Sequence, residues 1–148
     1  MAPMREQTAS YLIGRTDRLV RAQLEAALVE SGLSLAEFTA LSVLASRPGL
    51  SNARLARRSL VTPQAMHKVV RSLERAGLVE RNALPEGGRA LATTITTAGA
   101  AVVAELLPRI EQAEDRTLHA LDAADRRELV RLLTLAIEAP PEVTGLSE

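Results

Sequence analysis

The sequence predicts a mainly α-helical protein that contains one small β-hairpin. Apolar residues recur every three or four positions through most of the 148 residues, which is the spacing of an amphipathic helix. One stretch, residues 80–96, follows the period of two that is typical of strands. A chain of this length forms one compact domain with room for additional helices.

Start and stop signals delimit the first two helices. The first covers residues 8–31 with one broad apolar side, and Gly32 ends it. The second begins with a capping box, in which Ser34 and Glu37 each satisfy a backbone N–H of the other. It ends at residues 47–49, where a proline and a glycine break the helical pattern.

Two further helices follow. Ser51 caps a helix that extends to Arg58. Thr62 supplies the N-cap oxygen of the next helix, and Pro63 takes its first position, where a missing N–H is tolerated. This helix runs to about residue 76, and a glycine ends it.

The stretch with period two predicts a β-hairpin. Residues 80–84 and 89–96 form its strands, and the Pro-Glu-Gly-Gly sequence at 85–88 forms its turn. One face of the second strand carries Leu91, Thr93 and Ile95.

Two helices complete the predicted fold. The first covers residues 97–121 with a bend at Pro108, and Asp122 caps the second. The first and last helices of the chain carry more apolar surface than the middle segment can bury, so we expect a second copy of the chain to cover them. Residues 140–148 form a loose tail.

Helices joined by short turns and followed by a hairpin form the layout of a winged helix-turn-helix, in which one helix enters the major groove of DNA. Helix 63–76 has the two faces that this role needs. Met66, Val70 and Leu73 form an apolar side for the core. The opposite side carries only hydrogen-bonding or cationic side chains, namely Gln64, His67, Lys68, Arg71 and Arg75.

Specific roles follow from position and chemistry. The residues expected to read base edges are Thr62, Gln64, His67, Lys68 and Arg71. The residues expected to bind phosphates are Arg54, Arg57, Arg58 and Arg75. Arg89 follows the turn glycines and can enter the adjacent minor groove. For Arg81, a structural salt bridge and a phosphate contact are equally expected.

The charge distribution supports this interpretation. The chain has 18 basic and 18 acidic residues and a formal net charge of +0. Residues 47–89 contain nine basic and three acidic residues, so this segment carries +6 and the remainder −6. We expect the positive segment to contact DNA and the acidic remainder to be held away from the phosphates.

Three strings in this segment resemble the MarR family of bacterial transcriptional regulators. They are LVTPQAM at 60–66, LERAGLVER at 73–81 and ITTAG at 95–99. They match the family's recognition helix, the exit from that helix, and the start of the helix after the wing. The resemblance implies a lobe at 33–97, dimerisation helices at 1–32 and 98–139, and a tail at 140–148.

The resemblance also implies a function. Members of the family are homodimers that bind palindromic operators, usually as repressors released by small, often phenolic, ligands. Their ligand pocket lies between the dimerisation helices and the DNA-binding lobe. Here the family's acidic wing residue falls on Gly87 and its basic neighbour on Gly88, whereas Arg89 is kept.

Composition excludes several other classes. Without cysteine the chain has no disulfides and no thiol chemistry, and two histidines cannot form a three-histidine metal site. Tyr11 and Phe38 are too few aromatic residues for base stacking. No signal sequence or membrane-spanning run is visible, so we expect a cytoplasmic protein without cofactor.

Two alternatives remain. Asp115, His119 and Asp122 share one side of a helix and could hold a metal or polarise the histidine in an enzyme. The absence of a nucleophile beside them and the many charged neighbours favour a surface charge network instead. A winged helix that has lost DNA binding could instead serve as a protein–protein interaction module. Acidic or apolar replacements on helix 63–76 would indicate this, and the sequence has none.

Overall fold

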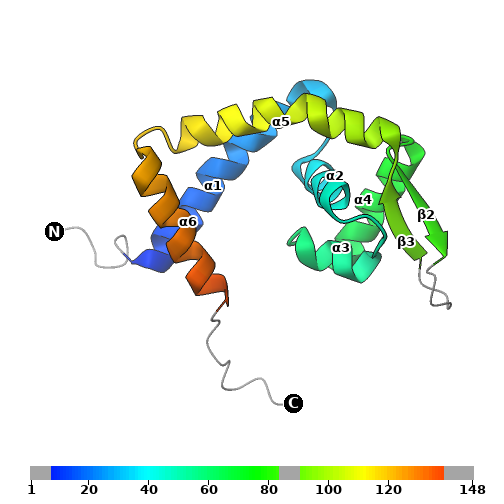
Figure 1. The fold of residues 1–148 in the computed structure, drawn as a ribbon, viewed down its shortest axis with the longest axis horizontal. Coiled ribbons are helices and arrows are strands. Elements are labelled where there is room, and N and C mark those ends of the chain that lie inside the picture. The colour runs from blue at the N-terminus through cyan, green and yellow to red at the C-terminus, as the bar shows by residue number, and fades with distance from the viewer. Residues whose placement is uncertain (1–7, 84–90, 139–148) are drawn as a thin grey trace, which may run out of the picture.

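The computed structural model describes residues 8–83 and 91–138. It is mainly helical, with a small three-stranded antiparallel sheet (Figure 1). In chain order the elements are α1 (Ala9–Leu28), the 3-10 turn η2 (Val29–Ser31), α2 (Leu35–Ser46), β1 (Leu50–Ser51), α3 (Asn52–Arg58), α4 (Pro63–Arg75), β2 (Val79–Ala83), β3 (Leu91–Ile95), α5 (Thr97–Thr117) and α6 (Ala123–Glu138).

The predicted helix starts are confirmed, because caps are local features. The capping box is present: the backbone N–H of Ser34 donates to Glu37 Oε2 at 2.8 Å, and the N–H of Glu37 donates to Ser34 Oγ at 3.2 Å. Asp122 Oδ1 accepts from the N–H of Ala124 at 2.7 Å and of Asp125 at 2.8 Å, and so caps α6.

Two predicted helix ends are too late. The last turn of the first predicted helix is the 3-10 turn η2, which closes on Gly32 with φ 72°. α5 ends at Thr117 and not at residue 121. The N–H of Leu121 donates instead to the carbonyl of Leu118 at 2.9 Å, so the chain has already turned before the cap of α6 begins.

The long helix α5 connects two ends of the molecule (Figure 1). At one end, α2, α3, α4 and the sheet form the lobe that the sequence predicts. At the other end lie α6 and the N-terminal part of α1. α1 packs along α5, and α2 contacts both of these helices.

Two hydrophobic clusters hold this arrangement. The first fills the lobe and includes Leu41 from α2, Leu55 from α3 and Met66 from α4, each fully buried. The second consists of Leu28, Phe38 and Leu106, and so joins α1, α2 and α5. This second cluster, separate from the core of the lobe, packs the lobe against the long helices.

The sheet contains a strand that the sequence did not predict. β3 is the central strand and pairs with β2 and with the two-residue strand β1. β1 is too short to show a period, and its pairing partner lies about forty residues away along the chain. Thr93 lies between Leu50 and Arg81 and is 1% exposed. Leu91 is 42% exposed because it lies beyond the end of β1.

Apolar side chains remain exposed away from the lobe. On α1 they are Tyr11, Leu12, Ile13 and Leu19, and on α6 they are Val130, Leu132, Leu133, Leu135 and Ile137. In the described part of the chain, no single helix is long and apolar enough to cross a membrane. Only α1 with η2 taken together with α2 meets that test, and this pair is bent by 87°.

Candidate nucleic-acid interface

The helix α4 is defined at both ends by local hydrogen bonds. Thr62 Oγ1 accepts from the N–H of Ala65 at 3.1 Å, and Pro63 occupies the first turn. At the other end, Gly77 has φ 73°, and the N–H of Leu78 donates to the carbonyl of Leu73 at 2.9 Å. This is a Schellman-type end, which needs a left-handed residue.

The two predicted faces of α4 are present. Met66, Val70 and Leu73 are at most 1% exposed and belong to the core of the lobe. The opposite face is solvent-exposed along its whole length, and its side chains are those of Gln64, His67, Lys68, Arg71 and Arg75. Thr62, Gln64, His67, Lys68 and Arg71 also line one shallow hollow, together with Asn52.

Asn52, which the sequence analysis did not single out, attaches α3 to the start of α4. Its Nδ2 donates to the carbonyl of Pro63 at 3.0 Å. Ser51 caps α3 directly before it, with Oγ accepting from the N–H of Arg54 at 3.4 Å. The N-termini of α3 and α4 therefore lie side by side, and the N-terminal residues of both helices border the same surface.

Arg81 forms an ion pair with Glu74, the one acidic residue of α4. Arg81 on β2 donates to Glu74 Oε2 from its terminal nitrogen at 2.6 Å and from Nε at 3.1 Å. The hydrogen bond from Arg81 lowers the pKa of Glu74 against the effect of desolvation, and the charges of Arg81 and Arg71 lower it further. Of the two roles expected for Arg81, the structure contains the salt bridge.

A basic strip continues from α4 towards the sheet. Lys68, Arg71, Arg75 and Arg81 line a second hollow, in which Glu74 is the acidic member. Arg75 Nε donates to the carbonyl of Arg71 at 3.3 Å, which holds its side chain along the helix. Glu74 is paired with Arg81, so the positive charges of Lys68, Arg71 and Arg75 on this strip stay uncompensated.

The other predicted phosphate-binding residues separate into two groups. Arg54 is exposed on α3. Arg57 and Arg58 are also exposed, but they line a different hollow, which lies between the lobe and the long helices. Arg89, with Gly87 and Gly88, lies outside the described residues.

This interlobe hollow has a volume of about 650 Å³. Its lining is mostly apolar but includes three arginines, and it comprises Leu24, Leu35, Phe38, Thr39, Ser42, Val43, Ser46, Arg47, Arg57, Arg58, Leu60 and Ile110. Ser42 Oγ is buried and has no hydrogen-bond partner among the described residues. Sequence reasoning missed this site because its residues come from four helices and from the two turns that follow α2 and α3.

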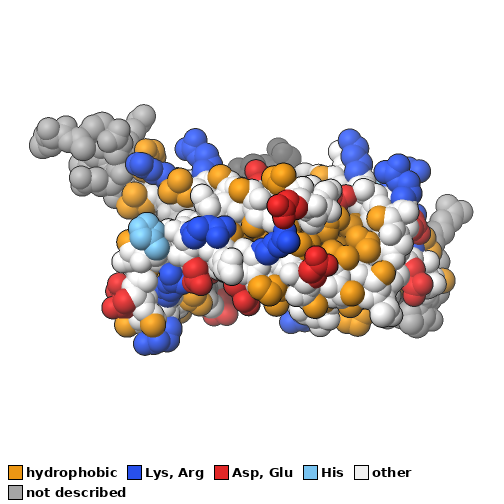
Figure 2. All heavy atoms as spheres, turned by 90° about the horizontal axis from the view of Figure 1, so that it is seen from above, with side chains coloured by type: hydrophobic (Ala, Val, Ile, Leu, Met, Phe, Trp, Pro, Cys, Tyr) orange, Lys and Arg blue, Asp and Glu red, His pale blue; other side chains and the backbone are white. Residues whose placement is uncertain are grey.

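The face over α1 and α5 is different in character. Figure 2 shows acidic, basic and apolar side chains interspersed along it. Part of this charge is paired between the two helices, since Arg109 donates to Glu30 at 2.8 Å. A mixed, internally paired surface of this kind lacks the single sign of charge that the α4 face presents.

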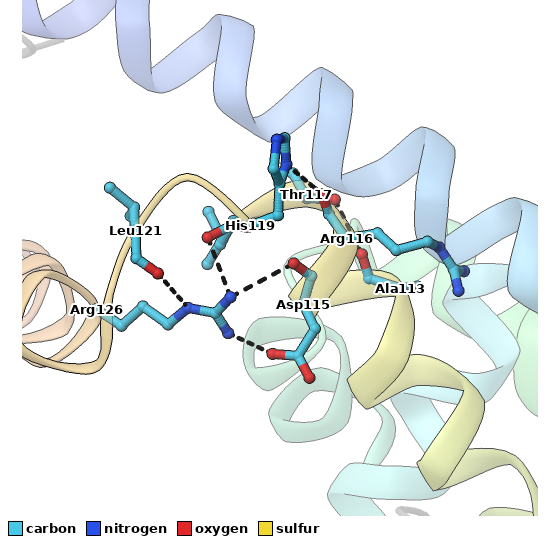
Figure 3. A network of polar contacts seen from close by, with 8 residues as sticks. Ala113, Asp115, Arg116, Thr117, His119, Leu121 and Arg126 are labelled. Carbon is cyan, nitrogen blue, oxygen red and sulfur yellow. Dashed lines mark hydrogen bonds and ion pairs between the residues drawn. The ribbon is translucent and has the colours of Figure 1, made fainter.

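Asp115, His119 and Asp122 do not share one side of a helix as predicted, because α5 ends at Thr117, and all three make structural interactions. Asp115 pairs with Arg126, whose guanidinium also donates to the carbonyls of Asp115, Leu118 and Leu121 (Figure 3). His119 Nδ1 lies 3.0 Å from the carbonyl oxygen of Arg116, and Asp122 caps α6. Within residues 8–83 and 91–138, no group of three histidine or acidic residues could hold a metal ion.

A helix pair held at its N-termini, an exposed cationic helix face and a following hairpin together define a winged helix-turn-helix protein. Comparison with known proteins identifies the family. The MarR family model matches residues 31–90. The HTH-type transcriptional repressor Rv2887 of Mycobacterium tuberculosis is 43% identical over 123 residues, which cover 83% of this chain and 88% of that protein. The chain belongs to the MarR family, and this membership excludes the enzymatic alternative.

Solved structures of the same relative have this fold. The crystal structure of Rv2887 in complex with salicylic acid has a TM-score of 0.73 at 41% identity, covering 86% of this chain and 95% of that one. The complex of Rv2887 with DNA has a TM-score of 0.72 at 39% identity, covering 86% and 96%.

Proposed function

We propose that the protein is a homodimeric repressor that binds a palindromic operator through α4 and the wing at residues 80–96. The observation that carries this proposal is the exposed face of α4, whose side chains are all cationic or hydrogen-bonding. The negative charge of Glu74 is neutralised by its ion pair with Arg81. The DNA complex of the relative Rv2887 supports it. An interaction module without DNA binding would have no need for such a face.

We assign the DNA contacts from the chemistry of the side chains on the α4 face. Base edges are read from the shared hollow by Thr62, Gln64, His67, Lys68 and Arg71. Gln64 can pair with adenine through two hydrogen bonds, and Lys68 and Arg71 can donate to guanine. Arg75 and Arg54 bind phosphates from the flanks, and Arg89 in the wing enters the minor groove.

Dimerisation uses the segments 1–32 and 98–139, while 33–97 forms the DNA-binding lobe and 140–148 a tail. The exposed apolar side chains of α1 and α6 support this division, because a second copy of the chain would bury them. A symmetric dimer presents two copies of α4, about one helical turn of DNA apart, which is why the operator is palindromic.

An aromatic acid releases the repressor from its operator. The relative Rv2887 is known in complex with salicylic acid. In this chain, the interlobe hollow offers apolar walls for a ring and arginines for a carboxylate. It lies next to the lobe, where an occupant can alter the position of α4.

The test is a titration of duplexes from the gene's upstream region at several salt concentrations. We expect tight, sequence-dependent binding with a steep salt dependence. Arg71→Ala weakens it about tenfold or more, whereas Arg116→Ala, an exposed arginine on α5, leaves it unchanged. Equally weak binding of the wild-type protein to all duplexes would contradict the proposed function and favour the interaction module.

A further inference from the structure

Asn52 and His67 lie together on the boundary between two hollows of the DNA-binding lobe. Both line the shallow hollow of the α4 face. Both also line a neighbouring hollow, which reaches the sheet at Arg81 and Thr93. They are the two residues that these hollows have in common. Side chains from α3 and α4 therefore meet where the α4 face adjoins the sheet.

The carboxamide of Asn52 lies against the first turn of α4. Its Nδ2 donates to the carbonyl of Pro63 at 3.0 Å, and Pro63 lies one helical turn before His67. Side chains of a helix lean towards its N-terminus and cover the preceding turn. The ring of His67 therefore extends back over the turn against which Asn52 is held.

Asn52 has one polar atom without a partner. Its Oδ1 is buried and accepts no hydrogen bond within the part of the chain that the structure describes. The neighbouring hydroxyls of Ser51 and Thr62 already accept N–H groups at the starts of α3 and α4. The ring of His67 is exposed and forms no hydrogen bond to any described residue. A buried acceptor without a donor is unfavourable, and a ring N–H of His67 can supply the donor.

The charged side chains that line the two hollows with His67 are all basic. They are Lys68, Arg71 and Arg81, so no carboxylate in either lining competes with Asn52 for the ring N–H. A neutral imidazole that donates through one ring nitrogen has an acceptor at the other. In the major groove, the bases that present a donor to such an acceptor are cytosine and adenine, through their amino groups.

We propose that Asn52 is a positioning residue for base recognition by His67. Asn52 Oδ1 accepts a hydrogen bond from one ring nitrogen of His67, which fixes the tautomer and the orientation of the ring. The other ring nitrogen accepts from the amino group of a cytosine or an adenine in the operator. This inference deepens the proposed function and rests on it.

The test uses the full-length, untagged protein and the operator found in the upstream region of its gene. One cytosine at a time is replaced by pyrimidin-2-one, or one adenine by purine, so that each change removes an amino group. Fluorescence anisotropy at about pH 8, above the usual titration range of histidine, measures the affinities. In each half-site we expect one replacement to weaken binding about tenfold in the wild-type protein and not in His67→Ala. His119→Ala, at the other histidine of the chain, should behave as the wild-type protein does.

Asn52→Ala separates positioning from a purely structural role. If Asn52 positions His67, this variant loses the tenfold effect at that one base pair. It keeps the effects of replacements at base pairs read by other residues, such as Gln64. If Asn52 serves only to attach α3 to α4, the variant binds every duplex more weakly by one factor and keeps the effect at the His67 base pair. Circular dichroism verifies that each variant is folded.

Nuclear magnetic resonance of isotope-labelled histidine gives a second readout. In His119→Ala, His67 is the one remaining histidine. In the operator complex of that variant we expect a single neutral tautomer of His67. Adding Asn52→Ala should convert it to a mixture of tautomers, because the ring N–H has lost its acceptor. An unchanged single tautomer would contradict the proposed hydrogen bond.

The results that overturn the inference are distinct from those that contradict the proposed function. A protein that binds its operator specifically, but in which no amino group depends on His67, overturns the inference alone. So does an amino-group effect that is the same in Asn52→Ala and in the wild-type protein. Absence of sequence-dependent DNA binding contradicts the proposed function, and the inference fails with it.

Discussion

Gly99 lies directly against the carbonyl oxygen of Leu78: a Cβ on Gly99 would be 2.2 Å from that oxygen and 2.8 Å from Cγ1 of Ile95. The same carbonyl accepts from the N–H of Thr96 at 3.0 Å, and Thr96 Oγ1 donates to the carbonyl of Gly77 at 2.7 Å. Thr96 also caps α5, accepting from the N–H of Gly99 at 3.1 Å. The exit of α4 and the start of α5 are thus one packed unit, which ties the lobe to the long helices.

Replacement of this glycine is expected to be costly. Gly99→Ala forces a methyl group into backbone atoms, which lowers the free energy of unfolding by about 3 kcal/mol. Urea denaturation at fixed protein concentration measures it. Gly14→Ala is the matched control, because a Cβ there meets nothing within 4 Å. In the interior of α1 it should raise stability by roughly 0.5–1 kcal/mol. Equal effects of the two changes would contradict the packing argument.

The Glu74–Arg81 pair is expected to matter for DNA binding more than for stability. Both side chains are partly exposed, at 38% and 25%, so breaking the pair should change the free energy of unfolding little. Arg81→Ala leaves the Glu74 carboxylate unpaired beside Arg71, and operator affinity at low salt should fall about tenfold.

Removing the Glu74 carboxylate as well shows whether its unpaired charge causes the loss of operator affinity. Glu74→Gln/Arg81→Ala should recover most of the lost operator affinity, measured by fluorescence anisotropy at the same salt concentration. If the double variant binds as weakly as Arg81→Ala, Arg81 itself contacts DNA and does not act by neutralising Glu74.

Stability is expected to decrease in acid through Glu37. Burial would raise the pKa of Glu37, but hydrogen bonds from the backbone of Ser34 and from the hydroxyls of Ser72 and Ser34 outweigh it and lower the pKa below its ordinary value. A pKa lowered in the folded state stabilises the protein above the unfolded pKa, and this stabilisation is lost as pH falls through the folded value.

Urea midpoints between pH 3 and pH 7 measure this contribution, about 1 kcal/mol for a helix cap. Glu37→Gln should be less stable than the wild-type protein at neutral pH and should show a smaller loss below about pH 4.5. Glu111→Gln, an exposed residue of α5, serves as the control and should follow the wild-type curve. A Glu37→Gln curve parallel to the wild-type curve would refute the role of Glu37.

Dimerisation is expected to depend on the apolar face of α6. Leu132 and Leu135 are 50% and 52% exposed in the single chain. Leu132→Glu/Leu135→Glu places two carboxylates where a second copy would bury leucines, which should raise the dimer dissociation constant at least a hundredfold. Sedimentation equilibrium measures it. Leu60→Glu, a change at a residue of the DNA-binding lobe that is 84% exposed, should leave the dimer intact.

The stability of the turn between α5 and α6 is expected to depend on Arg126. Its guanidinium binds the carbonyls of Asp115, Leu118 and Leu121, which closes the turn between α5 and α6. Arg126→Ala should lower the free energy of unfolding by about 2 kcal/mol. Asp115→Ala removes only the carboxylate partner, and the expected loss is below about 1 kcal/mol. Thermal melts at one protein concentration compare the two, and equal losses would assign the effect to the ion pair.

The helix starts, the two faces of α4 and the family could all be predicted from the order of the residues. Ser34, Thr62 and Asp122 satisfy N–H groups within three residues, so their roles are visible from local order alone. The alternation of core and exposed residues along α4 has the same local origin. The surface charge network expected around Asp115 and Asp122 is present as the Asp115–Arg126 ion pair and the Asp122 cap.

Contacts between residues far apart along the chain could not be predicted in this way and follow from the packing of the elements. β1 forms because Leu50 and Ser51 pair with β3. A segment of two residues is too short for its sequence pattern to predict that pairing. Arg81 forms a salt bridge with Glu74 because β2 lies beside α4. That Arg57 and Arg58 line the interlobe hollow together with residues of α1, α2 and α5 could not be seen from their sequence positions. Local hydrogen bonds and periodicity are encoded within a few residues, whereas contacts between elements depend on packing of the whole chain.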